Sequence, residues 1–307
     1  MPQNENMQNL QCYYVPDKST LIADEMELYK DIIDNGVFEF FANSFLVECS
    51  DSEDIGKITF ATMGSERQEK YRIATRFVDN KVVEKIALTN LCREVHLKQI
   101  TKNEQALKRY GRDVLESKWD DTGKIVSDFV KKPLLEDKVL EAWGDNNIER
   151  VFEVFDILYE EILNSSECAE WQNNILYSLG ADIAEDEYAY GPILRVAYLD
   201  MTLRNAFYEA GSICWFDQEW ILEDVPAKFV LCRAIAQFYY AYPDFEKFCS
   251  MQVLLDKYEI TSVYGEFQIL EHMFTELIFD EKQLIESAAF RGGDKETCIS
   301  NIKKLMS

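Results

Sequence analysis

Histidine is scarce in this chain of 307 residues, which contains only His96 and His272. Its eight cysteines include no C-x-x-C pair. Structural zinc sites are built mainly from closely spaced cysteine and histidine, so a zinc site of this kind is not expected. Neither histidine lies near a G-x-S-x-G turn, which argues against a serine-hydrolase triad. The cysteines are expected to be reduced, mostly buried thiols in a cytoplasmic protein.

Long apolar runs are also missing. No stretch of about 18 apolar residues occurs, so no membrane span is expected. The N-terminal segment MPQNENMQNLQ is polar and has no apolar core, so no signal peptide is expected either.

Positive charge is in short supply. The chain has 32 Lys and Arg against 56 Asp and Glu, a net charge of −24. Such a surface repels phosphate backbones, which argues against nucleic acid as a partner but leaves room for a local nucleotide pocket. Hydrophobic residues make up 47% and aromatics 13%, which is typical of a folded protein. The length suffices for one large domain or two lobes.

The first part of the chain is rich in strand patterns. A short helix is expected over 25–33, and residues before about 20 are expected to be irregular. Side chains of Lys85 and its neighbours in VVEKIAL alternate with a period of two, which is typical of a strand with two different faces. DNK at 79–81 is a plausible tight turn. The runs expected as strands of an antiparallel meander are 37–49, 57–63, 70–78 and 82–88.

The remainder is mainly helical. Thr89 or Asn90 can cap a helix that runs to about Tyr110, where Gly111 would stop it. A further hairpin is expected around Asp120–Gly123. Beyond a junction at 130–134, an apolar stripe predicts a helix over 146–163. Pro226 is well placed as a first-turn residue of another helix.

One stretch of the helical part carries recognisable chemistry. LDMTLRNAF places Asp200 five residues before Asn205, and the strand-like CWFDQEW places Asp217 twelve residues later. Phosphoryl transfer needs a carboxylate for the attacking hydroxyl, oxygen ligands for Mg²⁺ and a cation on the nucleotide phosphates. The D-x-x-x-x-N pattern and the following aspartate supply the first two groups.

At these residues the chain resembles the protein-kinase-like superfamily, on the side of the aminoglycoside-phosphotransferase-type small-molecule kinases. More narrowly, it resembles the kinase-like domains associated with bacterial polysaccharide (O-antigen) methyltransferases and glycosyltransferases. The likeness is carried by LDMTLRNAF (199–207), CWFDQEW (214–220) and PAKFVLCRAI (226–235). It implies an α+β, bilobal protein-kinase-like fold with an antiparallel β N-lobe, one main helix and a mainly helical C-lobe. The implied division is an N-terminal extension over 1–36, an N-lobe over 37–132 and a C-lobe over 133–307.

The resemblance implies a role for each residue of the central stretch. Asp200 would accept the proton of the acceptor hydroxyl. Arg204 would offset charge in the transition state. Asn205 and Asp217 would bind the metal ion. For Glu219 three alternatives stay open: a third metal ligand, a supporting residue of the site, or a carboxylate that faces water.

Further implied roles fall on the β-rich part. Lys85 would contact the α- and β-phosphates, although a solvent-facing lysine is the alternative. Glu94 is the preferred ion-pair partner of Lys85 on the following helix, with Glu104 as the second choice and a simple helix-dipole charge as the alternative for Glu94.

Two loops complete the implied nucleotide site. Met63 to Arg67 would cover the phosphates, with contacts from Gly64, Ser65 and Arg67. Phe129 and Val130, in a hinge over 129–132, would meet the adenine.

The sequence also departs from the family pattern. Tyr198 stands where the catalytic loop usually has histidine, and the phosphate loop holds a single glycine. Pro226 follows Asp217 by only nine residues, which leaves no room for a long activation loop and argues against a protein substrate.

The leading functional hypothesis is therefore an ATP- and Mg²⁺-dependent phosphotransferase acting on a hydroxyl of a small molecule or glycan. The resemblance favours polysaccharide biosynthesis, with a glycosyltransferase or methyltransferase as a partner. A pseudokinase or nucleotide-binding interaction module is the main alternative. A third alternative is phosphorylation of a cationic small molecule, which the acidic surface would attract.

Overall fold

The computed structural model describes residues 25–41, 58–64, 66–180, 183, 187–279, 300 and 303–304. The chain forms two compact units, Met1–Lys57 with Phe279–Ser307, and Ile58–Ile278. The first unit contains α1 (Glu25–Asp34), which confirms the helix predicted there, and α2 (Phe38–Phe41).

The strand predicted over 37–49 is wrong for the four residues of α2, and residues 42–49 lie outside the described part. Aromatic residues favour a strand only where a neighbouring strand can pair with it, so their strand propensity alone does not decide the structure.

The second unit begins with a five-stranded antiparallel sheet in the order β1-β2-β3-β5-β4. Its strands are β1 (Ile58–Met63), β2 (Ile73–Val78), β3 (Val82–Ala87), β4 (Ser117–Trp119) and β5 (Ile125–Asp128). Asp79 and Asn80 join β2 to β3 with φ of 53° and 52°, the left-handed conformation that a two-residue hairpin turn requires. The predicted meander and the predicted hairpin at Asp120–Gly123 are confirmed.

A helix between β3 and β4 covers one face of this sheet. It consists of α3 (Asn90–Cys92), a π-helical turn (Arg93–Leu97) and α4 (Lys98–Arg109). The Thr89 hydroxyl accepts the Cys92 N–H at 3.0 Å, and Gly111 with φ of 77° follows the last turn, so both predicted helix ends are confirmed. The helix packs on the sheet through a buried apolar cluster: Ile73, Cys92, Leu97, Ile100 and Ile125.

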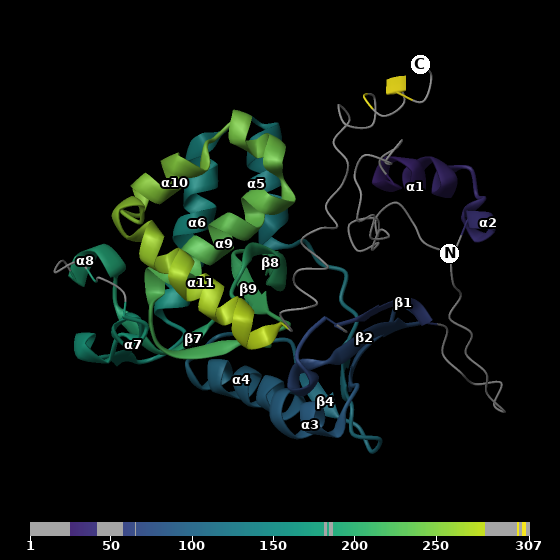
Figure 1. The fold of residues 1–307 in the computed structure, drawn as a ribbon, viewed down its shortest axis with the longest axis horizontal. Coiled ribbons are helices and arrows are strands. Elements are labelled where there is room, and N and C mark those ends of the chain that lie inside the picture. The colour runs from purple at the N-terminus through teal and green to yellow at the C-terminus, as the bar shows by residue number, and fades with distance from the viewer. Residues whose placement is uncertain are drawn as a thin grey trace. The chain divides into compact units, whose positions relative to one another are not determined.

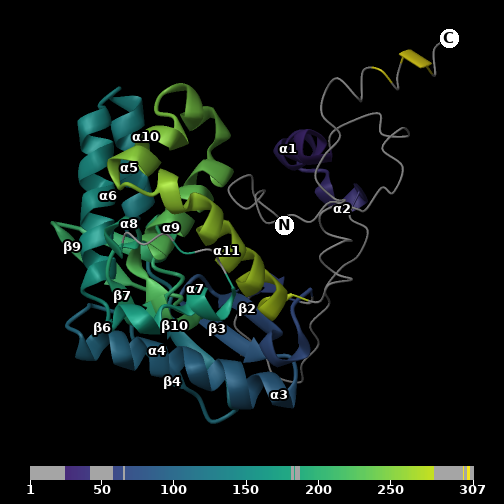
Figure 2. The same cartoon turned by 60° about the vertical axis from the view of Figure 1, so that its left-hand side comes forward.

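The rest of the second unit is mainly helical. The helix predicted over 146–163 is confirmed as α6 (Ile148–Leu163), with Asn147 as its cap. Pro226 is the last residue of β10 and lies just before α9 (Ala227–Ala241), so it is not the predicted first-turn residue. The helices are α5 (Leu135–Gly144), α6 (Ile148–Leu163), α7 (Ile175–Ser178), α8 (Glu187–Tyr190), α9 (Ala227–Ala241), α10 (Met251–Lys257) and α11 (Tyr264–Ile278). Figures 1 and 2 show α5, α6, α9 and α10 packed together, away from α3 and α4.

Two small sheets sit among these helices. One has the order β10-β7-β6, and the other is the hairpin of β8 and β9. Their strands are β6 (Cys168–Ala169), β7 (Ile193–Tyr198), β8 (Ala206–Glu209), β9 (Ser212–Trp215) and β10 (Ile221–Pro226). The end of β7 carries Asp200, and the link from β9 to β10 carries Asp217, so these strands set the positions of both carboxylates.

An antiparallel sheet with one long helix, followed by a mainly helical part, confirms the predicted α+β class. The end of α11 meets the loop after β1, where the Gln68 N–H donates to the Ile278 carbonyl at 2.7 Å (Figure 2). None of the described helices is long and apolar enough to cross a membrane. The five cysteines in the described part of the chain are free thiols.

Candidate functional site

Lys85 is the centre of a buried ionic network beneath the sheet. Side chains alternate along β3, so Lys85 shares a face with the residues opposite it, the half-buried Thr75 on β2 and the buried Ile125 on β5. Its ammonium group bonds to the carboxylates of Asp217 and Glu219. Burial disfavours the charged form, but these two carboxylates outweigh it and raise the pKa of Lys85 above its ordinary value. Lys85 is thus not a solvent-facing lysine.

Asp217 and Glu219 reach Lys85 from a tight turn between β9 and β10. Asp217 has φ of 58°, an unusual conformation for a residue with a side chain, and its carbonyl accepts the Glu219 N–H at 3.1 Å. The two carboxylates differ in their surroundings. The Asp217 side chain is 43% exposed, whereas that of Glu219 is 7% exposed.

Glu219 faces three basic groups. One oxygen bonds to Lys85; the other accepts from Arg67 Nη1 at 2.9 Å and lies 3.6 Å from His96 Nε2. Burial alone would raise the pKa of Glu219, but Lys85 and Arg67 hold it well below the ordinary value. The Glu219 side chain is therefore an anion throughout the neutral range.

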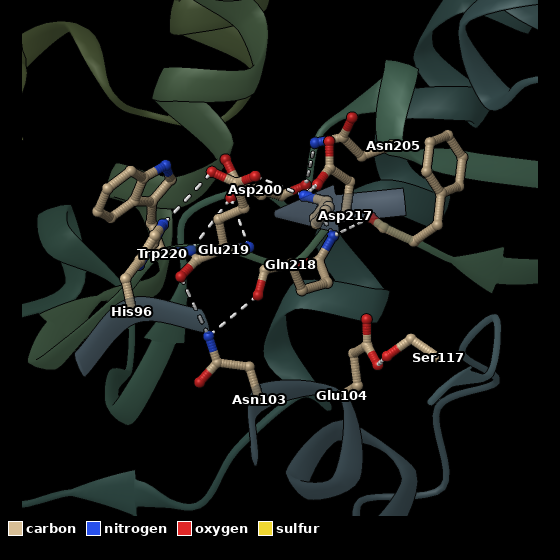
Figure 3. A network of polar contacts seen from close by, with 12 residues as sticks. His96, Asn103, Glu104, Ser117, Asp200, Asn205, Asp217, Gln218, Glu219 and Trp220 are labelled. Carbon is tan, nitrogen blue, oxygen red and sulfur yellow. Dashed lines mark hydrogen bonds and ion pairs between the residues drawn. The ribbon is translucent and has the colours of Figure 1, made fainter. Parts of the chain in front are cut away.

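Asp200 is held by the same turn. Its Oδ2 accepts the backbone N–H groups of Glu219 at 2.9 Å and Trp220 at 3.1 Å (Figure 3). Burial, reinforced by the nearby Glu219 carboxylate, raises the pKa of Asp200 to about 7. A carboxyl group with this pKa can exchange a proton near neutral pH, which suits a general base.

Asn205 lies on a 3₁₀ turn (Leu203–Asn205) directly after Asp200. Its amide nitrogen donates to the Asp200 carbonyl at 3.1 Å, which leaves the amide oxygen for another partner. The chemistry of these groups fits a magnesium ion, because an amide oxygen and the partly exposed Asp217 carboxylate are the hard oxygen ligands that Mg²⁺ takes together with phosphates. Within the described residues, no cluster of three Asp, Glu, His or Cys forms a metal site by itself.

The loop after β1 supplies Arg67 to the site. A Cβ atom on Gly64 would lie 2.9 Å from Arg67 Cδ, so the absence of a side chain at this glycine leaves room for the arginine to pass. The Gly64 N–H donates to the Ile73 carbonyl at 2.9 Å, which ties the loop to β2. The remaining predicted contact of this loop, Ser65, lies outside the described residues.

An aromatic group lies on the same face of the sheet as Lys85. The ring of Phe77 on β2 is 4.8 Å from that of Phe60 on β1 and 5.0 Å from that of Phe129, which follows β5. All three are half-buried, and the predicted hinge residue Val130 comes next in the chain. The sequence argument named Phe129 and Val130 but missed Phe60 and Phe77, although Phe77 shares the strand face of Lys85 by the same period of two.

The predicted partner of Lys85 on the helix is not the one in the structure. Glu94 is 62% exposed and bonds to Lys98, one turn further along the helix. The π-helical turn directs His96 and Leu97 inward, and Glu94 is left facing outward. The second choice, Glu104, is buried close to Lys85 but bonds to the Ser117 hydroxyl, and burial raises its pKa.

Two residues that the sequence argument missed hold the turn in place. Asn103 on α4 donates to the backbone carbonyls of Gln218 at 3.0 Å and Glu219 at 3.3 Å. The Gln218 amide donates to the carbonyls of Asp200 at 3.0 Å and Phe216 at 2.9 Å. Figure 3 shows Asn103 approaching the backbone of this turn, which itself includes Gln218. The sequence signal for Asn103 is its spacing: it lies between Ile100 and Leu107, on the same face of the predicted helix as these apolar residues.

Arg204 lies at the margin of this network. Its guanidinium is 3.7 Å from the Glu136 carboxylate on α5, and its side chain is largely exposed. Tyr198, which replaces the usual histidine, is buried at the end of β7. The structure therefore brings Lys85, Arg67, Asp200, Asn205, Asp217 and Glu219 together, and leaves Glu94 on the surface.

No protein-family model matches this chain, and no curated protein does. A search of solved structures gives matches that include three at 10–11% identity. A macrolide 2'-phosphotransferase, MphH from Brachybacterium faecium, has 10% identity and a TM-score of 0.34, over 76% of this chain and 93% of that one. An ethanolamine kinase from Plasmodium vivax has 11% identity and a TM-score of 0.37, over 100% and 94%. The aminoglycoside phosphotransferase APH(2")-IIa has 11% identity and a TM-score of 0.35, over 81% and 92%. Overlaps of this size establish neither a shared fold nor a shared activity.

Proposed function

We propose that this protein is an ATP- and Mg²⁺-dependent phosphotransferase that acts on a hydroxyl group of a small molecule or glycan. The observation that carries the proposal is the contact of Lys85 with Asp217, on the same turn whose backbone N–H groups hold Asp200. Lys85 and Asp217 are 132 positions apart in the chain, and they come from the sheet and from the helical part respectively.

The nucleotide would lie between these two parts. Lys85 and Arg67 are the cations for its phosphates, since positive groups in a sparsely solvated site hold phosphate oxygens strongly. The half-buried rings of Phe60, Phe77 and Phe129 offer an apolar surface for the adenine. Asn205 and Asp217 would hold the metal ion, which supplies charge neutralisation on the phosphates when bound.

The reaction needs an activated hydroxyl. Asp200 is oriented by two backbone N–H groups, and its second carboxylate oxygen is left to accept a proton from the acceptor. Its pKa of about 7 suits proton uptake at neutral pH. Arg204, next to Asn205 in the chain, is proposed to steady the charge that develops during transfer.

The finer part of the proposal concerns the acceptor. The likeness of LDMTLRNAF and CWFDQEW to kinase-like domains of polysaccharide assembly supports a glycan or its precursor, in cell-surface polysaccharide biosynthesis alongside a glycosyltransferase or methyltransferase. Free thiols are typical of a reducing compartment, which supports a cytoplasmic reaction.

The test has two stages. ATP with Mg²⁺ should raise the melting temperature, because a ligand that binds only the folded state stabilises it by about 2.7 kcal/mol at 100 times its dissociation constant. Phosphate transfer is then measured with a panel of neutral sugars, lipid-linked glycans and cationic amino compounds. If phosphate is transferred only to the cationic compounds, the acceptor is a cationic small molecule and not a glycan.

A second candidate function, a nucleotide-free interaction module, is favoured by one observation. Both cations of the site, Lys85 and Arg67, are already paired with carboxylates of the protein itself. If millimolar ATP with Mg²⁺ leaves the melting temperature unchanged, this interaction module replaces the phosphotransferase.

A further inference from the structure

Glu219 is the most enclosed of the three acidic side chains in the site. Each of its oxygens faces a cationic side chain: Oε1 bonds to Lys85, and Oε2 lies 2.9 Å from Arg67 Nη1. Asp217, two residues earlier, has Lys85 as its ion-pair partner and keeps a 43% exposed side chain. The two carboxylates therefore differ in what they can still bind.

His96 is a buried side chain that packs next to Glu219. It is 2% exposed, and its ring stacks on Trp220 at 4.3 Å and meets the edge of Tyr71 at 5.2 Å. Its Nε2 has no hydrogen-bond partner within the described part of the chain, and it points at Glu219 Oε2 from 3.6 Å. The π-helical turn at Arg93–Leu97 carries this imidazole, and such turns often occur at functional sites.

Arg67 is the second basic group that faces Glu219 Oε2. Its guanidinium lies over the Trp220 ring at 5.3 Å while it bonds to Glu219. Trp220 thus contacts both basic groups that face Oε2, the imidazole of His96 and the guanidinium of Arg67.

We propose that Glu219 is a positioning residue that holds Lys85 and Arg67 for the nucleotide phosphates, and is not a ligand of the metal ion. His96 and Trp220 fix Glu219 in that position. The inference rests on the proposed function, because it assigns the roles within the same site. It also assigns to Glu219 the pairing with Lys85 that the sequence predicts for Glu94.

The physical reason lies in what each carboxylate would give up. To bind a metal, Glu219 would have to release a cation that is buried with it, and a buried charge left without its partner is strongly unfavourable. Asp217 can turn its exposed oxygen to a metal while Lys85 stays on Glu219. Arrival of Mg²⁺ with the nucleotide then leaves both cations of the site in place.

The first experiment separates a positioning residue from a metal ligand. Phosphate transfer is measured against Mg²⁺ and against ATP for Glu219→Gln and Asp217→Asn, with Glu223→Gln, an exposed carboxylate on β10, as the matched control. Glu219→Gln should raise the KM for ATP about tenfold, as expected for a lost charged hydrogen bond, and leave the half-activating Mg²⁺ concentration unchanged. Asp217→Asn should raise that Mg²⁺ concentration. A parallel rise in Glu219→Gln would overturn the proposal.

A second experiment needs no turnover. The rate at which an amine-reactive acylating reagent labels Lys85 is followed by mass spectrometry in the nucleotide-free protein. Glu219→Gln should raise this rate and Glu223→Gln should not; equal rates in Glu219→Gln and the unaltered chain would overturn the proposal. If the unaltered protein neither binds nor hydrolyses ATP, the proposed function fails while this labelling result still reports on the pairing.

Two gentler variants cover the case in which Glu219→Gln does not fold. His96→Phe keeps the stack on Trp220 but removes the nitrogen that faces Glu219. Gly64→Ala pushes the Arg67 side chain from its path without altering any charge. Both should raise the KM for ATP several-fold, as for a weakened charged contact, at an unchanged Mg²⁺ requirement. A changed Mg²⁺ requirement in either one would count against the proposal.

Discussion

Glu84 and Lys85 are neighbours on β3, yet their side chains lie on opposite faces of the sheet. Glu84 bonds to Arg76 and Lys124, which are 8 and 40 positions away and belong to the sheet and its β4–β5 turn. Lys85 bonds to Asp217 and Glu219, which are 132 and 134 positions away. One strand therefore carries a local ion pair on its outer face and a long-range one on its inner face.

The comparison separates ion pairs that stabilise a sheet from those that assemble a site. On the outer face, Glu84 is matched by Arg76 on β2 and by Lys124 next to β5. On the inner face, the Asp217 side chain stays 43% exposed, and half-buried rings such as Phe77 lie on the same face as Lys85. Burial of charge is common to both faces; partly accessible polar and aromatic groups distinguish the inner one.

The largest effect is expected at Asp200, the site carboxylate that is hydrogen-bonded to backbone N–H groups. Asp200→Asn should lower kcat by about 10²–10⁴-fold, the usual contribution of a general base, while nucleotide binding persists. The measurement is phosphate transfer together with the shift in melting temperature caused by ATP and Mg²⁺. Unchanged ATP turnover would show that Asp200 is not the base.

A matched pair of lysines tests the comparison directly. Lys85→Met should lower kcat/KM for ATP by about 10²-fold, a typical loss for one donor of a charged site. It should also lower the free energy of unfolding by roughly 2–3 kcal/mol, less than for a fully buried pair because Asp217 is partly exposed.

Lys124→Met removes a cation from the outer face instead. It should leave the kinetics within about twofold and cost about 1 kcal/mol of stability, because Lys124 is partly exposed and the buried Glu84 keeps Arg76 as a partner. The measurements are steady-state kinetics and urea unfolding of both variants. Equal kinetic losses at the two lysines would refute the distinction between the faces.

A smaller effect is expected at the aromatic group. Phe77→Leu keeps an apolar side chain but removes the ring face offered to the adenine, and should raise the KM for ATP about 2- to 10-fold at unchanged kcat. Trp119→Leu, an exposed aromatic on β4, is the control and should leave the KM unaltered. If the KM for ATP stays constant in Phe77→Leu, the adenine does not bind against Phe77.

The smallest effect concerns stability at low pH. Burial would raise the pKa of Glu84, but Lys124 and Arg76 outweigh it and lower the pKa below its ordinary value. A lowered pKa in the folded state contributes stability that is complete above the unfolded value and is lost as the pH falls through the folded one.

Glu84→Gln should therefore be less stable than the unaltered chain by up to about 1 kcal/mol at pH 7, and the difference should shrink as the pH falls below about 4.5. Urea unfolding between pH 7 and pH 3 measures it. A difference that is independent of pH would assign the loss to packing, not to charge.

Much of the fold follows from local patterns. The alternation in VVEKIAL identifies β3 and the face of Lys85, the Thr89 cap and Gly111 bound the long helix, and DNK gives the β2–β3 turn. Each of these depends on neighbours in the chain, so the sequence alone suffices to predict them.

The pairing of Lys85 could not be predicted in the same way. The expectation at Glu94 assumes a regular helix, whereas the five-residue π-helical turn changes which side chains face the sheet and directs His96 inward. The contact of Glu219 with Lys85 depends on the left-handed conformation of Asp217, which an aspartate can adopt but which the sequence alone does not assign to this position. Non-local geometry of this kind leaves no short-range signal.

Asn103 has a mechanical consequence. Its amide links α4 to the backbone of the turn that carries Asp217 and Glu219 through two hydrogen bonds. The sheet with its helix and the helical part cannot separate on the α4 side unless both of these hydrogen bonds break. We therefore expect the nucleotide of the proposed function to enter along β1 and the segment after Phe129, and the α4 side to stay closed.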